Sequence, residues 1–269
     1  MKNIFCIDLE DWFHQSLVLP IYHNQRSTVE KNADRILEMF SLTNTTATFF
    51  CLGEVVETHP DLIRRISRQG HEIASHSYNH KIIYKQSPEE FEEDVKKSIG
   101  LISDLIGKTV KGFRAPSWSI TKDSLWALDI LQKSGLLYDS SIFPTDNFLY
   151  GIPGTSRYVN NIIINDKPFL EVPPSTFCFL GNTYGFSGGF YFRALPEFFI
   201  RACTDKTNRN DHPAIFYLHP VEIDMKIERV SHQLIDKIIL EYGIRGCEKK
   251  LMHILKRYEF DSIENVLNI

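Results

Sequence analysis

Cysteines are few in this 269-residue chain, and no two of them stand close together in sequence. The five are Cys6, Cys51, Cys178, Cys203 and Cys247, an odd number without a CxxC pair. A disulfide framework is therefore not expected, and a zinc site built from cysteines is not expected either.

Long apolar runs and an excess of basic charge are also absent from the sequence. No apolar stretch reaches the roughly 18 residues that a membrane-spanning helix needs, and residues 1–8 contain no apolar leader segment. The formal net charge of −4 does not favour a nucleic acid partner, because proteins that bind phosphates carry a basic surface. We therefore expect a cytoplasmic protein with no transmembrane segment and no nucleic acid partner. The oligomeric state stays open.

What the sequence does have is an alternation of strand and helix patterns. β-prone runs occupy residues 3–7, 47–52, 71–75, 110–114, 136–139, 169–172 and 214–218, and helical patterns occupy 32–40, 60–69, 88–106, 121–133, 228–242 and 248–256. This rhythm is typical of a parallel α/β fold, and the length suits one barrel. Residues 144–190 break the rhythm, so we predict a single domain over 1–269 with a loop-rich elaboration there, with room for a small hairpin.

Ionisable residues follow or end several of the predicted strands. They are Asp8, His76, Arg114, Asp139, Glu171 and His219. Because the carboxyl ends of parallel barrel strands meet at one face, and active sites are built there, we expect these side chains to converge.

His76 and His80 are the first candidates for metal ligands. Residues four apart lie on one face of a helical turn, from which both imidazoles could reach one ion. A lone HxxxH pattern is more often a surface pair, but this one follows a strand and has a matching acidic cluster in Asp8, Glu10 and Asp11. Two histidines and one carboxylate are a common catalytic zinc set. An acidic turn that caps a helix is the alternative interpretation of the cluster.

Arg114 and His219 each have two possible roles, one in the chemistry and one in the structure. Arg114 can lower the pKa of a catalytic carboxylate and orient it, or it can hold a loop through an ion pair. His219 can protonate a leaving amine as a general acid, although a lone histidine after a strand is more often structural.

These segments, in this order and over nearly the whole chain, resemble the polysaccharide deacetylase family, also called the NodB-homology or carbohydrate esterase family four. Residues 7–13 look like the first motif of a subgroup found with exopolysaccharide and PEP-CTERM/exosortase loci, and residues 138–144, 188–193 and 218–220 are similar to that subgroup too. The resemblance implies a distorted (β/α) barrel with fewer than eight parallel strands.

The resemblance also implies residue roles. It makes Asp8 the catalytic base, His76 and His80 the metal ligands, Arg114 the brace of the base, His219 the catalytic acid and Asp139 the residue that tunes this acid. Many members have a second aspartate directly after the base as a metal ligand, but Leu9 stands there in this chain. The carboxylate ligand is then Glu10 or Asp11. Glu10 is slightly favoured, because alternate residues of a strand point to the same side.

The predicted reaction is metal-dependent hydrolysis of an N-acetyl group on an amino sugar of a polysaccharide or its glycan precursor, with release of acetate. We expect a divalent metal, Zn²⁺ first and Co²⁺, Ni²⁺ or Mn²⁺ as alternatives. Tyr78, Pro116 and Trp118 are predicted to contact the substrate. The metal is expected to stabilise the oxyanion together with a backbone N–H, either in the loop after the histidine pair or near Tyr78. Aromatic residues available to hold sugar rings are Phe148, Tyr150, Phe177, Phe179, Tyr184 and Phe186.

Two other functions remain open at this point. The chain could hydrolyse another small amide or an N-formyl sugar, or it could be a non-catalytic sugar-binding relative. The second is disfavoured, because a binding protein does not need an acid opposite a base. The sequence does not predict whether the sugar is free, nucleotide-linked, lipid-linked or polymeric.

Overall fold

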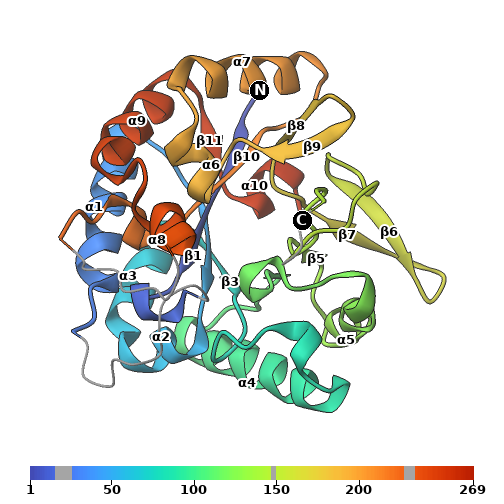
Figure 1. Ribbon diagram of the computed structural model, residues 1–269. Coiled ribbons are helices and arrows are strands. Elements are labelled where there is room, and N and C mark those ends of the chain that lie inside the picture. Colours follow the sequence, from blue (N-terminus) through green and yellow to red (C-terminus); the bar gives the residue numbers. More distant parts are fainter. Residues whose placement is uncertain (16–25, 147–149, 227–233) are drawn as a thin grey trace.

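The computed structural model describes residues 1–15, 26–146, 150–226 and 234–269, and strands alternate with helices through most of them (Figure 1). Seven strands run parallel in the order β10, β1, β2, β3, β4, β5, β7. Their bounds are Ile215–Leu218, Asn3–Leu9, Thr48–Cys51, Glu72–Ser75, Gly112–Phe113, Tyr138–Asp139 and Lys167–Glu171. β6 (Asn160–Ile164) pairs antiparallel with β7, and β11 (Phe260–Asp261), which lies outside this order, pairs parallel with the start of β1.

The barrel joins β7 to β10 through two serines. The backbone N–H of Ser175, just beyond β7, donates to the Ile215 carbonyl at 3.2 Å, and the Ile215 N–H donates to Ser175 Oγ at 2.8 Å. Ser187 Oγ donates to the same Ile215 carbonyl at 2.7 Å. These side chains stand where an eighth strand would close a regular barrel. The predicted distorted barrel with fewer than eight parallel strands along its wall is confirmed.

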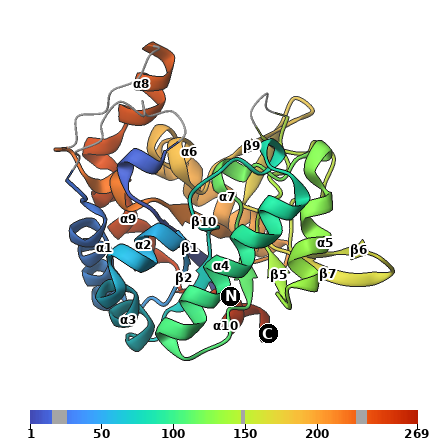
Figure 2. The same ribbon diagram turned by 90° about the horizontal axis from the view of Figure 1, so that it is seen from below.

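Helices surround this wall, as Figures 1 and 2 show. α4 (Pro88–Ile106) matches its prediction, because Ser87 and Glu90 form a capping box and Gly107 ends it at φ 66°. The other helices are α1 (Val29–Thr43), α2 (Gly53–Thr58), α3 (Pro60–Arg68), α5 (Trp126–Lys133), α6 (Gly189–Ala194), α7 (Glu197–Arg209), α8 (Leu234–Glu241), α9 (Ile244–Arg257) and α10 (Ile263–Leu267).

Alternation along β1 decides which residues face the site. Phe5 and Ile7 belong to the large apolar cluster that packs against the helices, whereas Ile4 and Cys6 belong to a second cluster together with Tyr138 and other residues. Because side chains alternate along a strand, Asp8 shares the face of Ile4 and Cys6. The strand therefore carries Asp8 to the carboxyl end of the barrel interior.

Two segments differ from the sequence prediction. Residues 144–190 contain the β6–β7 pair and a separate hairpin of β8 (Thr176–Phe179) and β9 (Asn182–Gly185), more strand than expected. α7 was not predicted, because its buried face includes Thr204 and Thr207 beside Ile200, and two threonines hide the apolar helical period. The helix predicted over 228–242 is seen as α8 from Leu234, and residues 228–233 lie outside the described residues.

All five cysteines are free. In the part of the chain that the structure describes, no helix combines the length and the apolar character needed to cross a bilayer.

Candidate active site

A cavity of about 340 Å³ opens at the carboxyl ends of the strands. Its polar lining includes Asp8, Glu10, His76, His80 and His219, and its walls include Trp118, Tyr150, Phe190, Tyr217, Ile239 and Leu240. The predicted convergence of Asp8, His76 and His219 is therefore seen, and Arg114 contacts Asp8 from beneath the cavity.

Glu10, His76 and His80 form a cluster that suits a metal ion. One ligand atom of each lies within 4.8 Å of the other two. The Nδ1 atom of His76 lies 2.8 Å from the Arg114 carbonyl oxygen, which leaves Nε2 available to the cluster. His80 Nε2 lies 2.7 Å from Glu10 Oε2.

The environment of these three residues fits a cation. Glu10 Oε2 is buried and has no hydrogen bond of good geometry, although His80 is close. Such a buried oxygen is costly unless something else satisfies it. Burial would raise the pKa of Glu10, but the adjacent histidines, His80 foremost, hold it below its ordinary value. Burial lowers the pKa of His76 to about 4, and neutral imidazole is the form that binds metals.

The two histidines converge through a loop and not, as predicted, on one face of a helical turn. Ser77 and His80 have φ angles of 64° and 59°, in the left-handed region that ordinary residues rarely adopt. The rings of His76 and His80 lie 5.4 Å apart between centroids. Gly53 lets the loop approach α2, because a Cβ there would lie 2.5 Å from Tyr78 Cδ2. Backbone strain of this kind gathers at functional sites.

Glu10 and Asp11 separate into two roles. Asp11 caps the short 3-10 helix η1 (Trp12–His14), where its Oδ1 accepts the Trp12 N–H at 3.0 Å. It also accepts the backbone N–H of Thr28 at 3.2 Å. The acidic-turn interpretation therefore fits Asp11, and Glu10 is the carboxylate that faces the histidines.

Asp8 is held by a buried arginine. Arg114 Nη1 donates to Asp8 Oδ1 at 2.7 Å, and its Nε and Nη2 donate to the carbonyl and hydroxyl of Ser140 at 3.2 and 2.8 Å. Burial disfavours the charged guanidinium, but Asp8 outweighs this and raises the pKa of Arg114. Asp8 is thereby fixed with Oδ2 at 3.7 Å from His219 Nε2.

His219 has a carboxylate partner that the sequence did not reveal. Glu222 Oε2 lies 3.4 Å from His219 Nδ1 and accepts the His219 backbone N–H at 3.1 Å. Burial alone would lower the pKa of His219, but Glu222 raises it to about 9. Arg193 Nε donates to Glu222 Oε1 at 2.9 Å. The i, i+3 spacing of His219 and Glu222, with Pro220 between them, was the only available signal of this pair.

Asp139 does not contact His219, contrary to its predicted role as the tuning residue. Its Oδ1 accepts the Ser141 hydroxyl at 2.5 Å, and Ser141 Oγ accepts the N–H of Ala115 at 2.8 Å. Asp139 is paired with Glu171, which accepts the Ile142 N–H at 3.1 Å. The two acids therefore brace the segments that flank Arg114.

The Asp139–Glu171 pair should make the fold more stable in mild acid. Burial raises the pKa of Asp139 to about 6, and burial together with the charge of Asp139 raises the pKa of Glu171 well above its ordinary value. Both folded-state values exceed the ordinary ones near 4. The native state therefore holds protons that the unfolded chain has lost, and stability falls as pH rises from about 4 through 6 and beyond.

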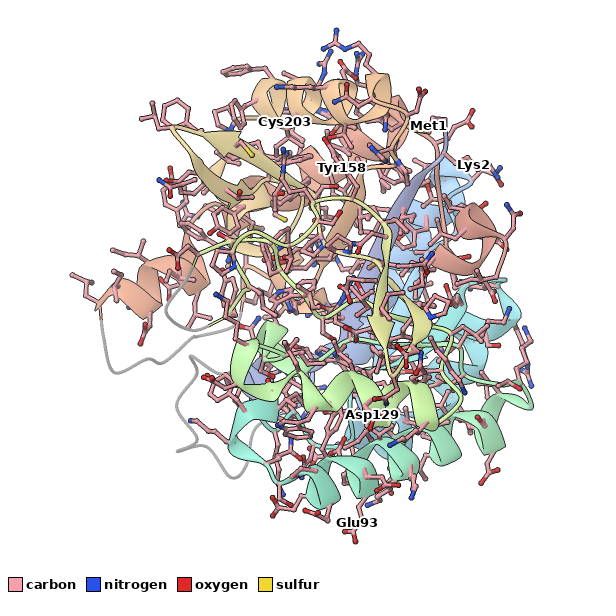
Figure 3. All side chains as sticks on the ribbon, turned by 90° about the vertical axis from the view of Figure 1, so that its right-hand side faces the viewer. Met1, Lys2, Glu93, Asp129, Tyr158 and Cys203 are labelled. Atoms are coloured by element: carbon pink, nitrogen blue, oxygen red, sulfur yellow. The ribbon has the colours of Figure 1, made fainter. Side chains whose placement is uncertain are left out.

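Glu171→Gln tests this pair. We expect the variant to gain on the order of 2 kcal/mol over the wild type at pH 8 but not at pH 4.5, measured as free energy of unfolding in urea. Glu93→Gln, at an exposed carboxylate on α4 (Figure 3), is the control. The same pH slope in Glu171→Gln and wild type would show that the pair does not share a proton.

The three predicted substrate contacts have different outcomes. Trp118 lines the cavity. Tyr78 does not, since its hydroxyl donates to Glu57 at 2.8 Å and its N–H donates to Asp94 at 2.9 Å, so that N–H is not available for an oxyanion. Pro116 is buried at the start of a short 3-10 turn and is not part of the lining.

Residues 23–136 match the family described as Polysaccharide deacetylase, and residues 140–268 match one described as Domain of unknown function (DUF3473). A peptidoglycan deacetylase from Helicobacter pylori is 32% identical over 44% of this chain and 39% of its own length. A chitooligosaccharide deacetylase from Bradyrhizobium is 27% identical over 69% of this chain and 75% of its own. The match thus spans about two fifths of the Helicobacter relative.

A solved structure from Mycobacterium smegmatis, of a protein assigned as a polysaccharide deacetylase, has a TM-score of 0.66 to this fold. It is 18% identical, and the match covers 98% of this chain and 88% of the other. Together the sheet and this likeness define the chain as a distorted (β/α)-barrel protein. The sequence match is more specific than the fold, and it identifies residues 23–136 as a polysaccharide deacetylase domain. The subgroup found with exopolysaccharide loci stays a prediction.

Proposed function

We propose that the protein is a metal-dependent N-deacetylase that removes acetyl groups from an amino sugar of a glycan and releases acetate. The observation that carries this proposal is the juxtaposition of two sets of residues in one cavity. Glu10, His76 and His80 form the metal-type cluster, and Asp8 and His219 face each other beside it at 3.7 Å. The deacetylase relatives support the choice of an N-acetylated sugar.

Glu10, His76 and His80 would hold the divalent metal, for which Zn²⁺ is our first choice because of its preference for this ligand set. When bound, such an ion polarises the amide carbonyl and lowers the pKa of a water molecule. The chain supplies the proton transfers.

Asp8 is suited to be the general base. Arg114 holds Oδ1, so Oδ2 is the oxygen left to take a proton from the attacking water. A new C–O bond forms at the acetyl carbon as this proton leaves.

His219 is suited to be the general acid. Glu222 keeps a proton on its imidazole at neutral pH, since the pKa is raised to about 9. Nε2 faces Asp8 across the site and donates its proton to the sugar nitrogen as the C–N bond breaks. The products are acetate and a free amine on the sugar.

We also propose that residues 1–269 act as one domain. β10, from the region matched to the domain of unknown function, pairs with β1 over four residues. The cavity takes His76 and His80 from the deacetylase match and His219 and Tyr150 from the other. A cytoplasmic location stays a prediction, and the exact sugar is open.

Acetate release tests the function. The protein is stripped with a chelator, reloaded with Zn²⁺, Co²⁺, Ni²⁺ or Mn²⁺, and offered N-acetylglucosamine as monomer, nucleotide conjugate and oligomer. We expect metal-restored acetate release from at least one of these. Metal uptake without acetate release from any acetylated sugar would favour another small amide or N-formyl substrate. Absence of metal uptake would favour a sugar-binding protein.

A further inference from the structure

A second cavity, of about 460 Å³, lies between the β8–β9 hairpin and α7 and shares no lining residue with the catalytic pocket. Tyr158 and Cys203, two of its residues, are labelled close together near α7 in Figure 3. Asn208 of α7 bonds Asn3, at the start of β1, at 2.7 Å. Since Asp8 lies five residues, or about 17 Å, further along that strand, α7 contacts the end of β1 opposite to Asp8.

The lining of this second cavity combines aromatic rings with positive charge. The rings are Tyr158, Phe177, Phe179 and Phe199, the cations are Arg157 and Lys206, and the remaining residues are Thr176, Cys178, Cys203, Thr207 and Asn210. Among the described residues that line it there is no aspartate or glutamate. In a chain with a net charge of −4, a cavity with cations only favours an anionic ligand.

The two cations are placed differently. Arg157 is held in position, because its Nε donates to Thr176 Oγ1 at 3.0 Å and its Nη2 donates to the Thr176 carbonyl. Within the described ranges, neither Arg157 nor Lys206 forms an ion pair with an acid. Burial raises the pKa of the half-buried Cys203 thiol, and the nearby charges of Lys206 and Arg157 oppose this rise. A ligand carboxylate in the cavity would meet two charged donors that have no acidic partner.

The rings favour a sugar over a nucleobase. Phe177 and Phe199 meet edge to face, with 78° between their planes. His212 covers one face of Tyr158 at 3.8 Å between centroids. Neither of these two contacts presents parallel rings on both sides of a ligand, and each leaves a single ring face toward the cavity. Single aromatic faces with a few polar groups suit one pyranose ring.

We propose that this cavity binds an acidic sugar unit of a glycan, with its carboxylate on Lys206 and Arg157 and its ring against the aromatic side chains. This rests on the proposed function, since it gives the chain a second anchor for the glycan that the catalytic pocket deacetylates. It also assigns a use to Phe177 and Phe179, which the catalytic pocket does not contain. The substrate would then be a polymer that contains uronate units.

The two thiols of the cavity provide the test. Cys178 and Cys203 line it, whereas Cys6, Cys51 and Cys247 are buried and serve as internal controls. Alkylation by iodoacetamide is followed by peptide mass spectrometry, with and without a tetrasaccharide of alternating N-acetylglucosamine and glucuronate. We expect the acidic tetrasaccharide to slow alkylation of Cys203 at least about fivefold, and the neutral N-acetylglucosamine tetramer to have no effect.

Lys206→Gln should raise the concentration of acidic tetrasaccharide needed for protection about tenfold, as the loss of one charge-assisted hydrogen bond implies. Lys122→Gln, at another exposed lysine, is the matched control, and its Cys203 should be protected at the same tetrasaccharide concentration as in the wild type. Three results would each overturn the proposal: equal protection by the neutral tetramer, a wild-type protecting concentration in Lys206→Gln, or stronger protection by a nucleoside diphosphate. Acetate release is assayed in parallel on the tetrasaccharides and on the other acetylated sugars. Protection without acetate release from any of them refutes the deacetylase function alone, and acetate release without protection refutes the second site alone.

Discussion

Replacing Asp8 by asparagine is expected to lower kcat for acetate release about 10³-fold while the metal content stays at the wild-type level. The amide keeps the size of the side chain and can still accept a hydrogen bond from Arg114, but it does not take a proton from water. The measurement combines steady-state kinetics on the substrate identified by acetate release with metal analysis of the purified variant.

Asp8→Asn also leaves Arg114 buried without its counter-charge, so a loss of folding has to be separated from a loss of chemistry. Asp261→Asn is a matched control, because Asp261 is also a buried, paired carboxylate, bonded to Lys2 near the opposite end of β1. We expect it to keep wild-type kcat. A folded Asp8→Asn protein with full kcat would remove Asp8 as the base, and one that has lost its metal would make Asp8 a ligand.

Glu10→Ala and Asp11→Ala should behave oppositely, although both carboxylates are 2% exposed and adjacent in sequence. Glu10→Ala removes the only carboxylate of the cluster, and we expect metal affinity to fall at least about 100-fold, since even residues behind the ligands contribute 10–100-fold. Acetate release falls with it. Asp11→Ala should keep the metal and lose about 1 kcal/mol of stability, because it removes the cap of η1.

Metal affinity by competition with a chelating dye and stability by urea unfolding distinguish the two variants. His76→Ala provides the reference for loss of a ligand. If Asp11→Ala lost metal as strongly as His76→Ala while Glu10→Ala retained it, the assignment of the carboxylate ligand would be reversed.

The parts of the site that lie on strand ends could be predicted from the sequence, because parallel topology alone brings Asp8, His76 and His219 to one face. The choice between Glu10 and Asp11 depended on a cap and on contacts to Thr28, seventeen positions away in sequence. The loop between the histidines was predicted as a helical turn, since spacing alone does not reveal the left-handed conformation of Ser77 and His80. Short sequence patterns do not predict contacts between distant segments or the backbone angles that those contacts impose.

For Asp139 and Glu222, the sequence likewise did not reveal which charged or polar partner each carboxylate has in the fold. Asp139 ends a strand like the other site residues, but Ser141 and Glu171 take up its carboxylate. Glu222 follows His219 by only three residues, yet nothing in the sequence says that its side chain turns back toward the imidazole. The second cavity depends on α7, whose threonine-rich face concealed the helix.

Arg193 connects α8, which contributes part of the pocket wall, to Glu222, the carboxylate partner of His219. The same guanidinium that donates to Glu222 also donates to the carbonyls of Ile239, Leu240 and Tyr242 at the carboxyl end of α8, and Ile239 and Leu240 line the pocket. Less contact between Arg193 and Glu222 would make that carboxylate more basic and His219 a weaker donor. The proton affinity of His219 and the position of α8 are therefore linked through Arg193, and we expect sequence changes in α8 to shift the pH dependence of the proposed reaction.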